Sequence, residues 1–327
     1  MRLINTGTLR MREFFDDNVP AYIILYHTWG DEEITFQDWQ IVEAFRDHET
    51  AKGSREYAPD SYAAKQQKRV ETIKAKAGYR KVVGFCTQAS KLRHHTPRRA
   101  QEWTWVDTVC ISSSELSEAI NAMFRWYQNS KLCMVYLSDV LLASESTKHH
   151  VNFENSRWFT RGWTLQELVA PKDLVFYDDD WTVIGNRGAE RIRGILESTT
   201  GINLNLLPQV GRPESLSGPS VGERMSCASK RKTTRAEDIA YCLLGIFDVN
   251  MPLLYGEGGP LAFVRLQEET MKRTTDHTIF AWSYHAHGMP IRLSDYHGLL
   301  APSPIYFSLG QSAALHDVDV PGKVPPF

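Results

Sequence analysis

The sequence predicts an α/β protein in which helices flank a mostly parallel β-sheet and a mainly helical extension follows on the C-terminal side. Three observations support this fold class. Apolar strands alternate with helical segments through the first half of the chain, which is typical of βαβ units. The first strand is apolar almost throughout, as in sheets that helices cover on both faces. A stretch rich in Pro, Gly and Ser at 207–222 then leads into a second half with mainly helical patterns.

The elements of the first half follow from apolar runs and turn signals. AYIILY at 21–26 predicts the first strand, and a Gly-Asp turn comes soon after it. The polar segment 46–66 predicts a loop. Residues 67–93 predict helix, at their basic start and again through VVGFCTQASKL, and WTWVDTVCI at 103–111 predicts a second buried strand.

A capping box, Ser112 with Glu115 three residues later, predicts the start of the next helix. LCMVYL at 132–137 predicts the third strand. RGWTLQELVAP at 161–171 predicts a short helix that ends at its proline, and DLVFYDDDW at 173–181 predicts the fourth strand.

The second half of the chain gives fewer signals. A second capping box, Thr234 with Glu237, predicts the start of an apolar helix. Pro260 is well placed to open a helix through AFVRLQEETMKR, and IFAWSY at 279–284 predicts a last strand. YGEGG at 255–259 lacks the lysine and the preceding strand of a phosphate-binding loop, so it predicts a turn.

The composition is that of a soluble globular protein. The chain has 327 residues, of which 42% are hydrophobic and 23% are charged. We expect an α/β core at 1–205 and a helical extension at 206–327 that packs on it as one continuous unit. No apolar run reaches the roughly 18 residues of a membrane span. The polar N-terminus predicts no signal peptide.

The cysteines give a further indication of the compartment. Their odd number and wide spacing are typical of reduced thiols in a cytoplasmic protein, and not of a disulfide framework or a zinc site. Cys110 and His27 are compatible with a nucleophile and its base, but a buried inert thiol is the commoner state at an apolar strand end. No histidine pair has metal-ligand spacing on a predicted helix, so the sequence predicts no metal site.

Charge is distributed unevenly along the chain. The net charge of −2 gives no global attraction to nucleic acid, yet residues 65–99 carry eleven Lys or Arg and one acidic residue, Glu71. Such a stretch can meet nucleic acid, lipid headgroups or an acidic partner. The commoner explanation is a solvated helix face that is balanced by acidic residues elsewhere, such as Asp178, Asp179 and Asp180.

The helix predicted in RGWTLQELVAP raises a question of geometry. Leu165, Leu168 and Val169 share one face of that helix, and Trp163 and Glu167, four residues apart, share the opposite face. One explanation is an exposed surface that happens to carry a tryptophan. The other is that this face borders a cleft in which the carboxylate is used.

Candidate site residues follow from the strand order. In open parallel sheets, ligands bind outside the carboxyl ends of the strands. Polar and aromatic residues that follow the predicted strands, together with two on the next helix, meet this criterion: His27, Trp29, Asp31, Asp107, Ser138, Trp163 and Glu167. Each has a structural explanation on its own, since Asp107 can cap a turn and Trp29 can cover the sheet edge. Their coincidence at one edge favours a small-molecule site.

Three stretches resemble the blocks of fungal heterokaryon-incompatibility (HET) domains: AYIILYHTWGDEEITFQD, WVDTVCISSSELSEAINAMFRWYQNSK and SRWFTRGWTLQELVAPKDLVFYD. MSCASKRKTTRAEDIAYCLLGIFDVNMPLLYGEGGPLAFVRLQEE resembles the extension of the larger members. The resemblance implies a cytoplasmic effector that kills the cell when genetically different hyphae fuse. It also implies an NLR-type regulatory module or an incompatibility partner, because a nucleotide-binding module and WD repeats follow this domain in several relatives.

Two positions depart from the pattern of the HET family. The family usually has serine where this chain has Tyr26, and aspartate where it has Ser112. If either residue touches the substrate, the resemblance implies weakened or absent activity in this chain.

W-T-L-Q-E-L at 163–168 is similar to the W-x-x-x-E pattern of TIR domains, notably the W-C-x-x-E-L form of plant receptors. This similarity implies a TIR- or flavodoxin-like core in which Glu167 is the catalytic carboxylate of NAD hydrolysis. A carboxylate beneath the ribose stabilises the oxocarbenium-like charge that develops when nicotinamide leaves. Trp163 or Trp29 offers a wall for a flat ring. NAD is then a candidate substrate, and no cofactor is implied.

The sequence leaves three hypotheses open. The first is an NAD glycohydrolase (NAD nucleosidase) activated by self-association, which Glu167→Ala would abolish. The second is a non-enzymatic interaction or oligomerisation module that recruits a separate killing activity, and the departures at Tyr26 and Ser112 favour it. The third is binding of membrane or nucleic acid by residues 65–99, which the net charge does not encourage. We therefore expect no nucleic-acid partner.

Overall fold

The computed structural model describes residues 1–15, 18–52, 61–92, 102–142, 151–202, 219–283 and 298–307. Seven strands form one sheet in the order β2-β1-β4-β3-β5-β6-β7. Their bounds are β1 Arg2–Asn5, β2 Met11–Glu13, β3 Tyr22–His27, β4 Trp103–Trp105, β5 Leu132–Tyr136, β6 Leu174–Tyr177 and β7 Val183–Asn186.

The sheet is mixed, so the prediction of a mostly parallel sheet holds only for its centre. Strands β4, β3, β5 and β6 pair in parallel. Antiparallel pairs join β2 to β1, β1 to β4 and β7 to β6. The outer strands β2 and β7 have only three and four residues and carry no buried side chain, so they lack the apolar run by which the central strands are recognised.

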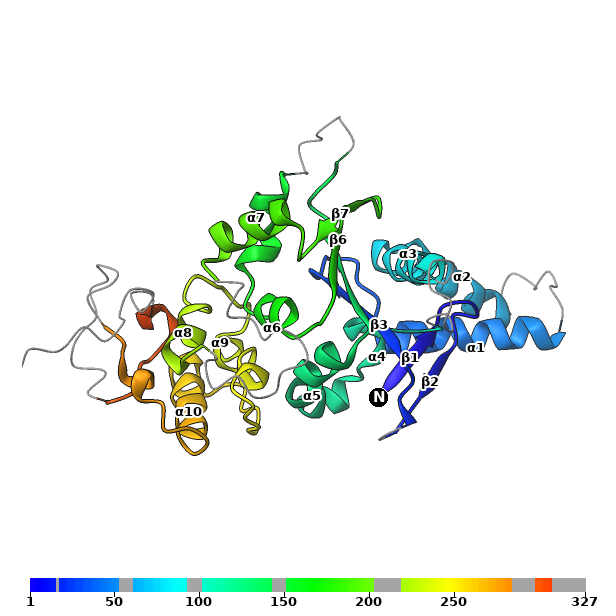
Figure 1. The fold of residues 1–327 in the computed structure, drawn as a ribbon. Coiled ribbons are helices and arrows are strands. Elements are labelled where there is room, and N and C mark those ends of the chain that lie inside the picture. Colours follow the sequence, from blue (N-terminus) through cyan, green and yellow to red (C-terminus); the bar gives the residue numbers. More distant parts are fainter. Residues whose placement is uncertain are drawn as a thin grey trace, which may run out of the picture.

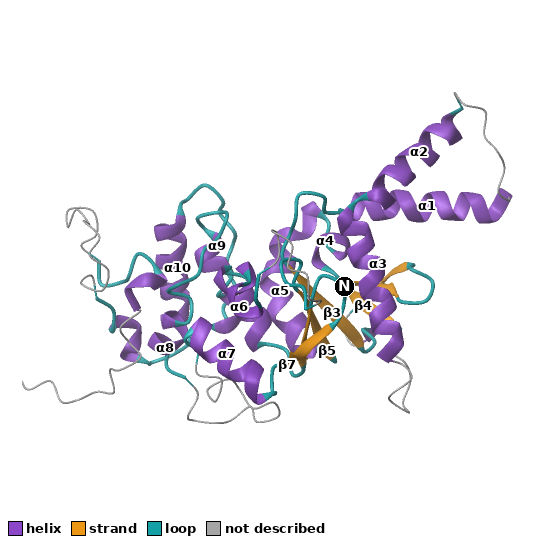
Figure 2. Cartoon of the chain, turned by 90° about the horizontal axis from the view of Figure 1, so that it is seen from above, coloured by secondary structure: helices purple, strands orange, loops and turns teal. Residues whose placement is uncertain are grey.

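Helices cover both faces of the sheet. Figure 1 shows α1 to α3 on one side, α5 to α7 on the other, and α8 to α10 beyond α6. The α-helices are α1 Phe36–Lys52, α2 Tyr62–Ala75, α3 Ala77–Lys91, α4 Asp107–Cys110, α5 Leu116–Asn129, α6 Thr164–Val169, α7 Glu190–Thr200, α8 Val221–Ser226, α9 Asp238–Tyr241 and α10 Gly259–Met271. Short 3₁₀ helices are η3 Ser113–Glu115, η4 Phe153–Asn155, η5 Arg157–Thr160, η7 Leu244–Ile246, η8 His277–Phe280 and η10 Pro304–Phe307. Figure 2 shows α1 and α2 projecting from the body at the end opposite α8 and α10.

Strand β3 lies at the centre of the core. All six of its residues are buried, because parallel neighbours flank it and helices cover both faces. Burial of each large apolar side chain contributes about 1.5–3 kcal/mol relative to exposure. The buried apolar side chains form one cluster that runs from Leu3 in β1 to Phe307 in η10.

The predicted loop at 46–66 is wrong at both ends. Helix α1 continues to Lys52 and α2 begins at Tyr62, while residues 53–60 lie outside the described residues. Few side chains of α1 are buried, among them Trp39 and Val42. A helix that buries so few apolar residues shows little periodicity in its sequence.

The predicted strand at 103–111 is too long. Strand β4 ends at Trp105, and the next residues form the helical turn α4. The predicted capping box at Ser112 is also wrong, since no side chain caps η3 and helix α5 begins at Leu116. Glu115 instead accepts two hydrogen bonds of 2.6 Å from the guanidinium of Arg2.

The C-terminal half contains a capping box, but at another place. Ser220 and Glu223 cap α8, whereas no side chain caps α9. The predicted apolar helix after Thr234 is broken into α9 and η7, and the predicted strand at 279–284 is wrong because Phe280 ends a 3₁₀ helix. The helix predicted at Pro260 is confirmed as α10. Of the loop predicted at 207–222, residues 207–218 lie outside the described residues.

The segment after α8 pairs with the segment before α6. The amide of Gly162 donates to the carbonyl of Lys232 at 2.9 Å, and the amide of Lys232 donates to the carbonyl of Thr160 at 2.7 Å. Arg231 is buried here, and its Nη1 donates to the carbonyl of Arg161 at 2.9 Å and also to Oγ1 of Thr164. Residues from both halves of the chain therefore fix the start of α6. No helix in the described part of the chain is both long and apolar enough to cross a membrane.

Gly245 is expected to tolerate no side chain. A Cβ at this position would lie 2.0 Å from Cβ of Phe124, which is fixed to the backbone of α5. Gly245→Ala should therefore lower the free energy of unfolding by about 1–3 kcal/mol, the usual cost of overpacking. Urea unfolding measures this change. Gly194→Ala is the control, because nothing lies within 4 Å of its added Cβ on α7 and the change should stabilise the helix by roughly 0.5–1 kcal/mol. Equal effects at the two sites would contradict the packing of η7 on α5.

Candidate functional site

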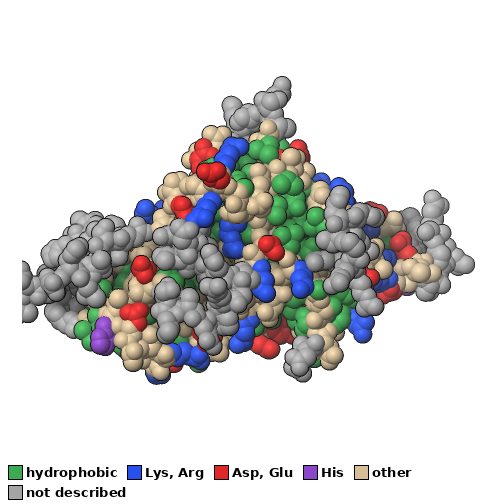
Figure 3. Space-filling view, in the orientation of Figure 1, with side chains coloured by type: hydrophobic (Ala, Val, Ile, Leu, Met, Phe, Trp, Pro, Cys, Tyr) green, Lys and Arg blue, Asp and Glu red, His purple; other side chains and the backbone are tan. Residues whose placement is uncertain are grey.

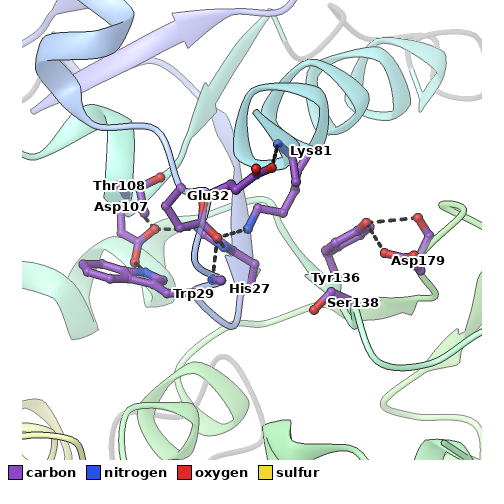
Figure 4. Close-up of polar contacts among 12 residues, drawn as sticks. His27, Trp29, Glu32, Lys81, Asp107, Thr108, Tyr136, Ser138 and Asp179 are labelled. Atoms are coloured by element: carbon purple, nitrogen blue, oxygen red, sulfur yellow. Dashed lines mark hydrogen bonds and ion pairs between the residues drawn. The ribbon is translucent and has the colours of Figure 1, made fainter. Parts of the chain in front are cut away.

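A buried histidine and an aspartate meet at the carboxyl edge of the sheet. His27 is the last residue of β3, and Asp107 follows the neighbouring strand β4. Nε2 of His27 lies 3.0 Å from Oδ1 of Asp107. Figure 4 shows the two side chains pointing toward each other across the ends of their strands.

Trp29 completes this group. Its indole nitrogen donates to Oδ2 of Asp107 at 2.8 Å, and the amide of Thr108 donates to Oδ1 at 2.7 Å. The rest of the indole stays open to solvent, since the side chain is 55% exposed. An exposed ring whose orientation is fixed by a hydrogen bond is suited to stacking against a flat ligand.

Glu33 and Lys81 lie on the other side of His27 and were not predicted. Oε1 of Glu33 lies 3.6 Å from Nδ1 of His27, too far for a hydrogen bond, and accepts a short one from Nζ of Lys81. Glu33 lies six residues after His27, so its proximity was accessible to sequence reasoning. Lys81 comes from α3, some fifty residues later, and no local pattern indicates that it returns to this place.

The pKa shifts of His27, Asp107 and Glu33 favour the charged forms of these three side chains, whereas burial lowers the pKa of Lys81. Burial and the charge of Lys81 would lower the pKa of His27, but Asp107 and Glu33 together raise it above its usual value. Burial would raise the pKa of Asp107, but the charge and hydrogen bond of His27 lower it. Burial also opposes ionisation of Glu33, yet His27 and Lys81 lower its pKa to about 2. The two carboxylates on either side of His27 therefore favour its protonated form.

His27→Gln is expected to destabilise the protein more at pH 5.5 than at pH 8.5. The pKa of His27 is higher in the folded protein than in the unfolded chain, where it is about 6.5. Its charge therefore contributes stability that is fully present below that unfolded value and is lost as pH rises through the raised folded pKa. Urea unfolding of both proteins at the two pH values measures the difference. A difference that stays constant or grows with pH would show that His27 is neutral in the fold.

The other predicted edge residues are distributed around this group. Asp31 is exposed in the turn after β3 and, within the described ranges, has no hydrogen bond or ion pair to the group. Ser138 follows β5 and its Oγ accepts a hydrogen bond of 3.1 Å from Arg157. Trp163 is half-buried at the start of α6, and its indole nitrogen donates to Oδ2 of Asp238 at 3.2 Å. Trp163 thus packs against the C-terminal half.

The prediction that Trp163 and Glu167 share a face of α6 that is exposed or borders a cleft is wrong for Glu167. The helix has no exposed face, because Thr164 to Leu168 are all buried and Glu167 is only 4% exposed. Packing between α5, the sheet and the segment at Arg231 encloses every side of this short helix. Periodicity alone gave no sign of this enclosure.

Glu167 lies in an interior pocket of tyrosines. Its Oε1 accepts a hydrogen bond of 3.2 Å from the hydroxyl of Tyr127 on α5. The buried side chain of Tyr26 lies close to the same carboxyl and packs edge to face on Trp158. Oε2 of Glu167 and the hydroxyl of Tyr26 have no hydrogen-bond partner in the part of the chain that the structure describes. Burial, followed by the charge of Asp107, raises the pKa of Glu167 well above its usual value.

The sheet separates the predicted site residues into two groups. Tyr26 and His27 are neighbours in β3, and successive side chains of a strand point to opposite faces. Tyr26 contacts Trp158 and Glu167 on the face of α5 and α6, whereas His27 meets Lys81 of α3 on the other face. The structure therefore brings His27, Trp29 and Asp107 together and places Glu167 behind them.

Cys110 is poorly placed to act as a nucleophile. The five thiols are free, as predicted, and Cys110 is buried in α4. Burial raises the pKa of Cys110 to about 12, so its thiolate is scarce at neutral pH. Among the described residues, no group of three or more His, Cys, Asp or Glu side chains is arranged to hold a metal ion.

Fold and contacts define an α/β protein in which a buried histidine pairs with a half-buried aspartate at the carboxyl edge of the sheet, with a buried carboxyl beneath them. The chain is 36% identical over 285 residues to the vegetative incompatibility protein HET-E-1 of Podospora anserina. The aligned region covers 83% of this chain and 18% of that protein. The chain is therefore a relative of a fungal vegetative incompatibility protein and spans less than a fifth of its length.

Two further comparisons complete this result. Residues 261–303, which include most of α10, match the family model of a domain of unknown function, DUF8212. No solved structure matches the chain.

Proposed function

We propose that this chain is a cytoplasmic cell-death effector domain of fungal vegetative incompatibility, and that it hydrolyses NAD when it self-associates. The similarity to HET-E-1 supports the role in incompatibility. The proposed arrangement is an effector core at 1–205 that an NLR-type module or an incompatibility partner brings into contact with its own copies.

The observation that carries the enzymatic proposal is the burial of Glu167. A carboxyl that is 4% exposed, with one oxygen lacking a hydrogen bond in the described parts of the chain, costs stability and is not explained by packing. Ionisable groups with strongly shifted pKa values that lie near a polar edge are candidates for catalysis. Glu167 meets this criterion, and its pKa responds to Asp107 at that edge.

The strand order supports a TIR- or flavodoxin-like core. Counted from β3, the four parallel strands lie in the order 2-1-3-4. This is the flavodoxin-like order without its fifth strand, in which ligands bind where the first and third strands diverge. In this chain that point lies between His27 of β3 and Tyr136 of β5, which pair in register.

The proposed reaction breaks the bond between C1′ of the ribose and the nicotinamide nitrogen. The bonding electron pair leaves with nicotinamide, which becomes neutral, and positive charge develops on the ribose. An ionised Glu167 would stabilise that charge, and water would then add to C1′ and lose a proton. Trp29 would stack against a flat ring of the substrate.

In this proposal, self-association changes the environment of Glu167. In the described conformation, burial raises the pKa of Glu167 well above its usual value and so favours its protonated form. Activation would then consist of opening the pocket around Glu167, which would ionise the carboxyl and admit the ribose. Resting protein at low concentration would cleave NAD slowly.

The same burial favours the second candidate function, a non-enzymatic module that recruits a separate killing activity. A glutamate enclosed by α5, the sheet and the segment at Arg231 offers no open site to a substrate. Under this alternative, Glu167 would only contribute to the packing of α6.

One experiment distinguishes the two functions. Nicotinamide release from NAD is measured with the purified chain at rising concentration and with the chain fused to an oligomerising partner. Release that increases with self-association supports the enzyme. Cell death on overexpression in a fungal host, with the NAD level unchanged, supports the recruiting module.

A further inference from the structure

A pocket of about 390 Å³ opens between α2, α3 and the loop that follows β6. This volume lies within the range of small-molecule sites. Its lining combines cations, aromatic rings and hydrogen-bonding groups: Lys74, Tyr79, Arg80, Thr87, Gln88, Asp180 and Trp181 are among the residues that form it. It shares no residue with the candidate site described above.

The two cations of the pocket are free to bind an anion. Lys74 lies in the last turn of α2 and Arg80 is the fourth residue of α3, and both are exposed. Neither forms an ion pair within the described residues. The acidic residue in the lining is Asp180, which does not pair with either cation in the described structure. The lining therefore keeps a net charge of +1.

Trp181 is placed at the pocket by a strained turn. Its backbone has φ of +61°, a left-handed conformation that costs a tryptophan about 1–2 kcal/mol. The buried carboxylate of Asp178 holds this turn by accepting hydrogen bonds from the amides of Asp180 at 3.1 Å and Thr182 at 2.8 Å. Strain of this kind persists where the surrounding structure requires it and is frequent at ligand sites.

The indole ring of Trp181 forms an aromatic wall. Its ring centroid lies 4.6 Å from that of Tyr136, 5.7 Å from that of Tyr177 and 6.2 Å from that of Phe85, on which it stacks. A Cβ on Gly84 of α3 would lie 2.5 Å from the indole nitrogen, and the side chain of Trp181 remains partly exposed. In the orientation of Figure 1, Figure 3 shows hydrophobic side chains gathered on the molecular surface over β6 and β7. A planar ligand ring can rest on such a wall.

We propose that this pocket binds a small nucleotide. Lys74 and Arg80 hold the phosphate, as lysine and arginine commonly do. The aromatic wall of Trp181 takes the base, and Asp180 accepts hydrogen bonds from the ribose hydroxyls, as acidic residues do in other nucleotide sites. The phosphate of the nucleotide would thus be the ligand of basic residues on α2 and α3. This inference does not depend on NAD hydrolysis, because binding here requires neither Glu167 nor His27.

Binding of AMP, adenosine and inorganic phosphate to the whole chain, measured by titration calorimetry, tests the proposal. AMP is expected to bind at least tenfold more tightly than adenosine or phosphate. The Lys74→Glu/Arg80→Glu variant should weaken AMP binding at least tenfold. The matched control is Lys65→Glu/Lys68→Glu, which reverses two exposed charges of α2 outside the pocket and should change AMP binding less than threefold.

Three results would overturn the proposal. One is a lack of AMP binding by the folded chain. Another is an equal loss of binding in the control variant, which would indicate a diffuse basic surface for a polyanion. The third is phosphate binding as tight as AMP binding, which would mean that contact between the base and the aromatic wall adds nothing to the affinity. AMP binding that persists in Glu167→Gln separates this site from the proposed catalytic one.

Discussion

Glu167→Gln is expected to reduce NAD cleavage by roughly 100-fold or more, the usual effect of removing one electrostatic group that stabilises the transition state. Glutamine keeps the size of the side chain and its hydrogen bond with the hydroxyl of Tyr127. It cannot ionise, so it offers no negative charge to the ribose. The loss should appear in nicotinamide release by the self-associated chain and also in killing on overexpression.

The stability of the same variant gives an independent test. The pKa of Glu167 is raised in the fold, so between its unfolded and folded values the native state binds a proton that the unfolded chain has lost. The free energy of unfolding of the wild type therefore falls as pH rises above the unfolded pKa of about 4.5. Glu167→Gln has no carboxyl at this position, so its free energy of unfolding does not show this fall. We expect the stability of the variant relative to the wild type to increase in urea unfolding as pH rises above about 4.5.

The combination of the two results separates function from packing. A variant that is more stable and yet inactive identifies Glu167 as a residue retained for its chemistry at the expense of stability. Full activity in Glu167→Gln would remove Glu167 from the mechanism. Killing without NAD loss by both proteins would favour the recruiting module.

The central strands were predictable because their signal is local. The ends of β3 and β5 lie within one residue of the predicted strands 21–26 and 132–137. β6 lies inside the predicted strand 173–181 but ends four residues earlier, at Tyr177. Continuous apolar runs between turn residues are strong indicators of buried parallel strands. The antiparallel pairing of β1 with β4 joins residues about a hundred positions apart, and no local pattern specifies it.

The candidate site was predictable where it depended on strand ends. His27 ends one strand and Asp107 follows another, and the two strands are neighbours in the sheet. The rule for carboxyl edges therefore placed these two residues together correctly. For Glu167 the prediction failed because the sequence of a six-residue helix indicates which residues share a face. It does not indicate which parts of the chain pack against that face. Its cover includes Tyr127 of α5, and Arg231 of a segment some sixty residues later encloses the same helix.

Tyr26→Ser is expected to have the largest effect on stability. The ring of Tyr26 is buried, packs edge to face on Trp158 at 5.6 Å between centroids, and fills the space beside Glu167. Removing an aromatic ring from a core leaves a cavity and costs about 3–5 kcal/mol. Urea unfolding should show this loss. Tyr26→Phe is the control and should cost much less stability, because it keeps the buried ring and its contact with Trp158.

The cavity in Tyr26→Ser is also expected to raise NAD cleavage at least about tenfold, a change of 1.4 kcal/mol in the barrier. HET domains, which this chain resembles, usually carry serine at this position. A serine would leave a path between the sheet edge at His27 and the carboxyl of Glu167, and water in that path would favour its ionisation. Nicotinamide release by the folded serine variant, but not by Tyr26→Phe, would show that the tyrosine ring closes the site. If the serine variant folds and binds NAD without cleaving it, access to Glu167 does not limit the reaction, and recruitment of a separate killing activity becomes the better account.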